Sequence, residues 1–396
     1  MLTAPTTSLE GTQPGAFAPP LKKPVESGRL LGLDLLRFLA VTLVICRHVR
    51  ISGDSWFSRI LNVAHTGGST GVDIFFALSG FLISGLLFGE YQKTGEIKLG
   101  RFLIRRGWKI YPPLWALVGF SLILWVTGHS QMFSKHKLLG EVLFLQNYIG
   151  GLWFTTWSLG VEEHFYLFLA AVVFVMLWFN SGKQRGASGP FHIIPALFVF
   201  MAIGCLIARI IRWRYHANDF SAVYVQYPTD CRMDALMFGV LLSYWWHFSR
   251  DDRFRHVVHR WRWGLLFLGV LGLAPAFIWN SDHNGPLCVF GVMAYSVGSG
   301  GLILGMLSFH DLERVRFLKH FGKLGTYSYS AYLWHGPVFI FLIQDFYGFY
   351  GSKDWLQFLV SFVGTWIAGI VAASLVEIPV LSLRERYFPR RAPAPV

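Results

Sequence analysis

The chain has 396 residues, of which 54% are hydrophobic and only 14% are charged, and its mean hydropathy is +0.45. This composition excludes an ordinary soluble domain, which would need far more charge at this length, and indicates a membrane protein. The formal net charge of +13 comes mostly from short segments between apolar stretches, so it indicates membrane topology, and we expect no nucleic-acid partner. The four cysteines show neither a disulfide framework nor a metal-ligand spacing, and we expect no metal.

Apolar stretches close to the roughly 20 residues needed to cross a bilayer recur along the chain. We predict ten spans, around residues 30–49, 71–89, 111–128, 164–180, 191–209, 231–248, 263–280, 287–309, 324–344 and 356–380. The fold is therefore predicted to be all-α, with one transmembrane domain over residues 30–380. Residues 1–29 are predicted to be a disordered cytoplasmic tail, and residues 381–396 a basic cytoplasmic tail.

Basic segments set the predicted topology, because Lys and Arg concentrate in cytoplasmic loops. They follow the second, fourth, sixth, eighth and last predicted spans, at residues 101–109, 183–185, 250–262, 314–319 and 384–391. With ten spans, all of these segments and both termini lie inside. The shorter apolar stretch at 138–150 is therefore predicted to be a re-entrant or interfacial element. One segment does not fit, since it places Arg209, Arg212 and Arg214 outside, where we expect them to face a polar cavity or an anionic acceptor.

The first predicted span carries Arg37 and, eleven residues later, His48. At about 100° per residue, eleven steps close three turns almost completely, so both side chains project from one face, about 16 Å apart along the axis. Ionisable groups inside an apolar span cost about 2.5 to 3.5 kcal/mol each on insertion scales, so they indicate function. The pattern predicts an enzyme embedded in a bilayer. A buried ion pair with Asp34, three residues earlier, is the alternative interpretation of Arg37.

Six sequence blocks follow one another over almost all of residues 30–380. They are the Arg37 and His48 pair, GVDIFFALSGFLIS at 71–84, RRGWKIYPP at 105–113, WSLGVEEHFYL at 157–167, RMDALMFG at 232–239 and SYSAYLWHGPV at 328–338. Together they resemble the acyltransferase-3 family, which comprises polytopic membrane O-acyltransferases that modify bacterial polysaccharides and other extracytoplasmic acceptors. The chain departs from the family pattern at Lys109, where an arginine with its planar fork is common, and at His164, where a glutamine is common; the latter is expected to alter acceptor preference.

The resemblance implies that Arg37 and His48 are catalytic. A neutral His48 imidazole can take the proton of an acceptor hydroxyl as it attacks an acyl thioester, which typically contributes about 10²- to 10⁴-fold. Arg37 would hold donor phosphate or pantetheine oxygens, or tune the potential of the site. Asp73 is expected to orient His48 or to pair with an arginine. Of the adjacent Glu162 and Glu163, about 100° apart on a helix, the resemblance favours Glu162 as the site acid near the acceptor, with Glu163 facing solvent or a basic partner.

Two further groups of residues complete the predicted site. The donor is expected to meet Ser79, Arg105, Arg106, Lys109, Arg232, Tyr332 and His335, and the acceptor to meet Trp157, Ser158 and Glu163. Basic groups at a cytoplasmic entrance suit the phosphates of coenzyme A, although lipid headgroups or topology explain them equally well on charge alone. Arg232 is expected to pair with Asp234. This pair either faces the site or serves only to neutralise the two charges. Ser79 lacks a G-x-S-x-G context, so a nucleophilic role is disfavoured, and His335 either lines the donor channel or packs through a hydrogen bond.

We therefore predict a multi-pass enzyme of the inner (plasma) membrane. It would move an acyl group, expected to be acetyl, from cytoplasmic acyl-CoA to a hydroxyl of an extracytoplasmic or lipid-linked glycan or of a small acceptor. Acetyl-CoA is thus the expected co-substrate, and membrane lipid and a second copy of the chain are expected partners. The alternatives are a secondary transporter of a polar or anionic solute, since polar groups within spans also mark transport pathways, and a catalytically silent scaffold.

Overall fold

The computed structural model describes residues 31–49, 51–128, 134–179, 189–341 and 353–389. Within these segments the chain is helical and forms no β-strand, which confirms the all-α prediction. The predicted tail at 1–29 lies outside the described residues, as does the last part of the predicted tail at 381–396. The first part of that second tail is helical, because it continues the last helix to Tyr387.

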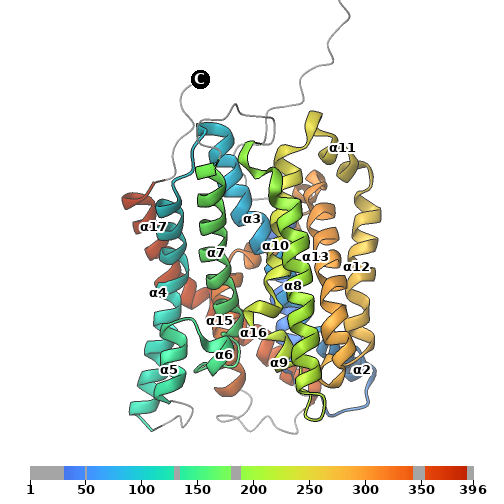
Figure 1. Cartoon of the computed structure of the whole chain (residues 1–396). Helices are drawn as coiled ribbons and strands as arrows, with labels where there is room; N and C mark the ends of the chain where they lie inside the picture. The colour runs from blue at the N-terminus through green and yellow to red at the C-terminus, as the bar shows by residue number, and fades with distance from the viewer. Residues whose placement is uncertain (1–30, 50, 129–133, 180–188, 342–352, 390–396) are drawn as a thin grey trace, which may run out of the picture. The chain divides into compact units, whose positions relative to one another are not determined.

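The long helices run side by side, with α5, α6 and α9 near one end of the array and α11 near the other (Figure 1). In chain order the α-helices are α1 (Leu31–His48), α2 (Trp56–Gly67), α3 (Thr70–Thr94), α4 (Leu99–Val126), α5 (Lys135–Val142), α6 (Gln146–Ile149), α7 (Trp157–Phe179), α8 (Ile194–Tyr215), α9 (Val223–Gln226), α10 (Met233–Phe248), α11 (Arg253–Arg260), α12 (Arg262–Ile278), α13 (Val292–Leu307), α14 (Arg316–Gly325), α15 (Ser328–Val338), α16 (Asp354–Ala372) and α17 (Ile378–Tyr387). Short turns of other helical types join some of them, including η2 (Thr229–Cys231) and η8 (Ala373–Glu377).

Six segments are long and apolar enough to cross a membrane. They are Thr70–Thr94, Leu99–Val126, Trp157–Phe179, Gly189–Tyr215, Leu287–Leu307 and Asp354–Tyr387. A seventh is reached if α11 and α12, which are bent by 68° at their junction, count as one span. These segments overlap seven of the ten predicted spans, so a polytopic membrane protein is supported, while the count of ten and the cytoplasmic termini stay predictions.

The other three predicted spans are helices that fall short of a free-standing span for physical reasons. The 18 residues of α1 include three charged side chains, Asp34, Arg37 and Arg47. The 16 residues of α10 rise only about 24 Å, less than the roughly 30 Å of a hydrocarbon core. The 11 residues of α15 rise about 16 Å, and the helical path continues to Phe341, where this described segment ends. All three are largely buried against other helices.

The stretch at 138–150, which the sequence assigned to a re-entrant or interfacial element, forms the end of α5 and the short α6. The two helices have 8 and 4 residues, so neither is long enough to cross a bilayer. Between them Phe144 adopts a positive φ of 57°, which breaks the helical path. The prediction that this stretch is not an eleventh span is therefore in agreement with the structure.

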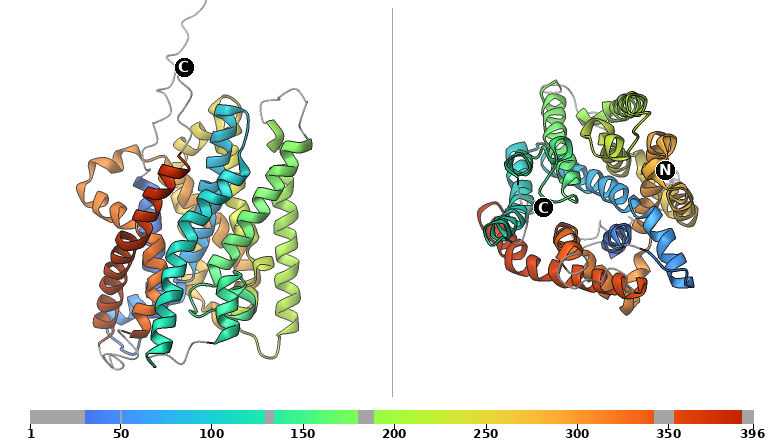
Figure 2. Two further views of the ribbon diagram at one scale, coloured as in Figure 1. Left: turned by 90° about the vertical axis from the view of Figure 1, so that its left-hand side faces the viewer. Right: turned by 90° about the horizontal axis from the view of Figure 1, so that it is seen from below.

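The helix that carries Arg37 and His48 lies inside the array, where α3, α2, α14 and α15 pack around it (Figure 2). At the start of α3, Gly71 lies directly against α1: a Cβ there would lie 2.4 Å from the Ala40 carbonyl oxygen. The glycine of the GVD sequence therefore allows α3 to approach the α1 backbone. Most of α1 is thus covered by protein, although Leu39 is exposed, and its polar side chains lie between helices.

The helices α3 and α10 approach each other even more closely, through two reciprocal glycines. A Cβ on Gly80 would lie 1.9 Å from the Leu236 carbonyl oxygen, and one on Gly239 would lie 2.2 Å from the Ala77 carbonyl oxygen. Neither distance can be reached by a real side chain, so only glycine fits at both positions. This contact explains why the blocks at 71–84 and 232–239 contain glycine: they pack on each other.

Candidate active site

The ring of His48 lies at the last residue of α1, among aromatic rings from other segments. Its centroid is 4.7 Å from that of Phe154, 5.3 Å from that of His335 and 6.3 Å from that of Phe339. The His48 and His335 rings are stacked, with 29° between their planes. Within the described residues we find no hydrogen bond to His48, whose side chain keeps some solvent-accessible surface. The lone pair that a general base needs is therefore not engaged by these neighbours.

The residue before His48 is fixed by a small polar network. Arg47 Nη2 lies 2.5 Å from Asp282 Oδ1, and Arg47 Nη1 lies 3.2 Å from His65 Nε2. His65 Nδ1 lies 3.1 Å from the Val49 carbonyl, which can only accept, so Nδ1 carries the proton and Nε2 accepts from Arg47. Burial and the Arg47 charge lower the pKa of His65, which favours this neutral form. The network attaches the end of α1 to α2 and thereby restrains the backbone at His48.

Phe154, whose ring contacts His48, belongs to the loop 150–156, which is held by a buried carboxylate. Glu141 Oε1 accepts hydrogen bonds from the Leu152 N–H at 3.0 Å and from the Thr156 hydroxyl at 2.5 Å. Glu141 is 1% exposed, and burial raises its pKa to about 7. The carboxyl of α5 thus organises the loop that covers His48.

Tyr332 and Ser158, which the sequence assigned to donor and acceptor respectively, are hydrogen-bonded to each other. The Tyr332 hydroxyl donates to the Thr155 carbonyl at 3.1 Å, so Ser158 Oγ donates to the Tyr332 hydroxyl at 2.7 Å. The Tyr332 ring is 5.2 Å from that of His335. The structure therefore brings Ser158, Tyr332 and His335 together beside His48.

A second group of polar residues lies toward the other end of α1. Arg37, Arg106 and Lys109 are close enough to act on one another electrostatically, and Glu162 acts on both cations of α4. The Arg106 guanidinium lies 5.6 Å from the centroid of the Tyr166 ring. Neither Arg106 nor Lys109 forms a salt bridge with any described acid. These cations, enclosed by helices yet partly accessible to solvent, suit an anionic ligand.

Glu162 belongs to this cation group, although the sequence placed it near the acceptor. The Tyr166 hydroxyl donates to Glu162 Oε2 at 2.6 Å, so Ser79 Oγ donates to the Tyr166 hydroxyl at 2.7 Å. The hydroxyl proton of Ser79 is therefore used within the protein. At the same end of the molecule, Arg37 forms an ion pair with Asp34, as the alternative interpretation predicted, while 28% of the Arg37 side chain stays accessible.

Two buried ion pairs correct the predictions for Arg232 and Arg209. Arg232 Nη2 lies 2.7 Å from Asp73 Oδ1, and Arg209 Nη1 lies 2.8 Å from Asp234 Oδ2. Arg232 and Asp234 thus do not pair with each other. Asp73 pairs with an arginine, the second of its two predicted roles. Arg209 is fully buried, so it faces neither a polar cavity nor an acceptor, since a buried guanidinium needs its own counter-ion.

Two more predicted residues have partners away from both groups. Glu163 is buried and accepts a hydrogen bond from the Tyr111 hydroxyl at 3.1 Å, so it faces neither solvent nor a basic partner. Arg105 donates to the Phe388 carbonyl and lies 2.6 Å from Glu385 Oε1. Arg105 therefore attaches α4 to the C-terminal end of α17, apart from its neighbour Arg106.

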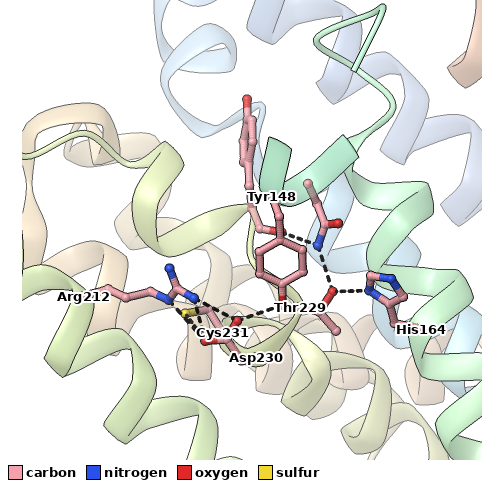
Figure 3. A network of polar contacts seen from close by, with 8 residues as sticks. Tyr148, His164, Arg212, Thr229, Asp230 and Cys231 are labelled. Atoms are coloured by element: carbon pink, nitrogen blue, oxygen red, sulfur yellow. Dashed lines mark hydrogen bonds and ion pairs between the residues drawn. The ribbon is translucent and has the colours of Figure 1, made fainter. Parts of the chain in front are cut away.

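A polar network joins α6, α7 and α8 to the turn η2 (Figure 3). The Thr229 hydroxyl lies 2.7 Å from His164 Nδ1, and the Tyr148 hydroxyl donates to Asp230 at 3.0 Å. Arg212 binds both carboxylate oxygens of Asp230, at 3.0 and 3.1 Å. His164 and Arg212 are thus engaged within the protein, and they fix the segment that also carries Tyr227.

The rim residue Trp157 stacks on Tyr227, with ring centroids 4.4 Å apart and 6° between the planes. Sequence reasoning did not identify Tyr227, Thr229 or Asp230, because their segment reads as a connecting loop. It also missed Tyr166 and Glu377, for which there were signals. Tyr166 lies four residues after Glu162 and so on the same helix face, and Glu377 is an acid within an apolar stretch.

Comparisons with known proteins identify the family of the chain. The chain is 28% identical over 330 residues to "Peptidoglycan O-acetyltransferase OatA" of Listeria monocytogenes, covering 77% of this chain and 49% of that protein. It is 26% identical over 392 residues to "O-acetyltransferase OatA" of Staphylococcus aureus, covering 91% of this chain and 58% of that protein. The chain therefore spans about half the length of these relatives. No solved structure matches it. The acyltransferase domain of the acyltransferase-3 family matches residues 30–374, and the chain belongs to this family.

Proposed function

We propose that the protein is a membrane O-acyltransferase of the inner (plasma) membrane that moves an acetyl group from acyl-CoA to a hydroxyl of an extracytoplasmic or lipid-linked glycan. Family membership supports acyl transfer, and the names of the two relatives support acetyl as the acyl group. The name of the Listeria relative also favours a glycan acceptor. The long apolar helices support a membrane location.

The observation that carries this proposal is the placement of the His48 imidazole, which has no hydrogen-bond partner among the described residues, inside an aromatic site at one end of α1. We assign His48 as the general base. It takes the proton of the acceptor hydroxyl as that oxygen bonds to the acyl carbon, and the thioester C–S bond then breaks. The surrounding rings of Phe154 and Phe339 exclude water, which limits competing hydrolysis of the thioester.

The donor is proposed to bind at the other end of the same helix. The phosphates of acyl-CoA would lie against Arg106 and Lys109, with Arg37 adding to the positive potential. Between this group and His48 the α1 helix rises about 16 Å, a separation suited to a long, flexible thioester arm. Glu162 and Tyr166 position the two α4 cations in this scheme, and Ser79 acts through Tyr166.

The acceptor is proposed to approach from the opposite face, past the stacked Trp157 and Tyr227 and the hydroxyl of Ser158. Loop charges favour a cytoplasmic side for the cation end of α1, so the acceptor face would be extracytoplasmic. The network of Figure 3 holds this rim in place. In this scheme Asp73 and Arg232 stabilise the fold beneath the site.

The proposal is tested with the full chain in proteoliposomes, supplied with radiolabelled acetyl-CoA and soluble peptidoglycan fragments. We expect label to move to the glycan and the glycan mass to rise by one acetyl group. His48→Ala should abolish the transfer, whereas His256→Ala, at an exposed histidine of α11, should not. Uptake of a radiolabelled polar solute without any acyl transfer would overturn the proposal in favour of a transporter.

A further inference from the structure

His335, the neighbour of His48, has an unsatisfied ring nitrogen. The residue is 3% exposed, and its Nδ1 contacts the carbonyl of Tyr332 one turn earlier on α15. Because a carbonyl only accepts, Nδ1 carries the proton, and Nε2 of the neutral ring presents a lone pair. Among the described residues, Nε2 is buried without a hydrogen-bond partner. Most buried polar atoms in proteins have a partner, so this lone pair is suited to accept from a bound donor group.

A second buried polar atom without a partner lies on the loop that packs against α15. Thr155 Oγ1 has no hydrogen-bond partner in the described structure and lies against α15, where a Cβ on Gly336 would be 3.1 Å from it. A threonine hydroxyl can donate, whereas the neutral His335 Nε2 can only accept. The site beside His48 therefore offers one acceptor and one donor, the complement of a single amide group.

The course of α15 indicates which substrate brings that amide. The Tyr329 hydroxyl donates to the carbonyl of Ile110, the residue after Lys109, at 2.8 Å, and Ser330 Oγ donates to Glu377 at 2.6 Å. Glu377 in turn acts electrostatically on Lys109. His335, six residues after Tyr329, lies about 9 Å further along the axis. The helix thus runs from the proposed phosphate site to His48, along the path of the donor.

We propose that His335 Nε2 and Thr155 Oγ1 bind the amide of the donor arm that is nearest to the thioester, with the amide N–H donating to Nε2 and the Thr155 hydroxyl donating to the amide carbonyl. This contact holds the acyl carbon beside His48. The inference rests on the proposed function. His335 and Thr155 exchange no proton: His48 takes the acceptor proton, the new O–C bond forms, the C–S bond breaks, and the proton goes to the departing thiolate.

The test uses two small donors that differ only at the proposed contact. One is the acetyl thioester of N-acetylcysteamine, and the other is its ester analogue, in which an oxygen replaces the N–H. Both lack phosphates, so they bypass Arg106 and Lys109. Thiol release in the presence of peptidoglycan fragments gives kcat/KM for each donor. The wild-type protein should prefer the amide by about tenfold, the effect of one buried hydrogen bond.

Variants test which residues cause the preference for the amide donor. His335→Phe keeps a ring beside His48 but removes Nε2, so kcat/KM for the amide should fall to that of the ester, which stays unchanged. Thr155→Val should lower kcat/KM for both donors to a similar extent, since both donors keep the carbonyl that the Thr155 hydroxyl would bind. Ser296→Ala removes a buried hydroxyl that bonds to the Val292 carbonyl of its own helix and should change neither.

Two results would overturn the inference: a wild-type protein that does not distinguish the donors, which needs no variant to fold, or a His335→Phe variant that keeps the preference. Both leave the proposed function intact as long as acetyl-CoA supports transfer and His48→Ala abolishes it. Transfer that survives His48→Ala would instead count against the proposed base.

Discussion

The two ends of α1 differ in charge, in partners and in what they can bind. Near its start, Arg37, Arg106 and Lys109 gather with Glu162, in a group whose hydrogen bonds run through Tyr166. Near its end, His48 lies among Phe154, Phe339 and a second imidazole. The difference teaches that the cations suited to a polyanionic donor and the imidazole that must stay neutral to act as a base lie at opposite ends of one helix. At the imidazole end, the neighbouring Arg47 is paired with Asp282.

The largest effect that separates the two ends is expected from His48→Ala. Loss of the base should lower kcat about 10²- to 10⁴-fold and leave KM for acetyl-CoA within about twofold, because none of the proposed donor-binding contacts is made by His48 itself. Steady-state kinetics on the purified variant measures both quantities. A variant with low activity and a greatly raised KM would show that the two ends are not separate.

Glu141→Gln tests how the thermal stability of the protein depends on pH through the imidazole end of α1. Burial raises the pKa of Glu141 to about 7, above its usual 4.5. The buried carboxyl therefore stabilises the folded protein in its protonated form. This contribution to the free energy of unfolding, at most about 3 kcal/mol, is complete below about pH 4.5 and is lost as the pH rises through 7. We expect the Tm of the detergent-solubilised wild type to fall between pH 5 and 8.5, and that of Glu141→Gln to fall less. Parallel curves for the two proteins would contradict this.

Arg106→Gln and Lys109→Gln test the cation end. Each should raise KM for acetyl-CoA about tenfold, the effect of losing one charge-assisted hydrogen bond, without changing kcat. The phosphate-free thioester of N-acetylcysteamine serves as the matched donor, for which neither variant should differ from wild type. Equal losses with both donors would mean that the cations do not bind phosphate.

The smallest effect is expected from Arg105→Ala, next to Arg106 in the sequence. Its partner Glu385 is 42% exposed, and such ion pairs contribute less than about 1 kcal/mol. We expect a slightly lower Tm and a KM for acetyl-CoA within twofold of wild type. A tenfold rise in KM would show that Arg105 contributes to donor binding together with Arg106 and Lys109.

The sequence predicted the architecture better than the pairing of charges. Each apolar stretch is a signal contained in one continuous segment of about 20 residues, so the main helices were predicted in their order along the chain. The family blocks identified the segments that meet at the site. Hydropathy does not show that the short helices α10 and α15 are covered by other helices, so the spans predicted there stay predictions. Their burial comes from tertiary packing, which a window of sequence does not record.

Which charges pair is decided by contacts between distant segments. Arg232 and Asp234 are near neighbours in sequence, yet each pairs with another helix, with Asp73 and Arg209 respectively. In the same way, Glu162 acts electrostatically on Arg106 and Lys109, two cations of another helix, which the sequence did not predict. The pair of Asp34 and Arg37, three residues apart on one helix, was open to prediction because it is short-range.

The reciprocal glycines Gly80 and Gly239 have a mechanical consequence. The backbones of α3 and α10 are in direct contact there, and the Asp73–Arg232 ion pair joins the same two helices. We therefore expect α3 and α10 to move together when a bulky acceptor enters or a spent thiol leaves, so that the segments around them make the larger adjustments.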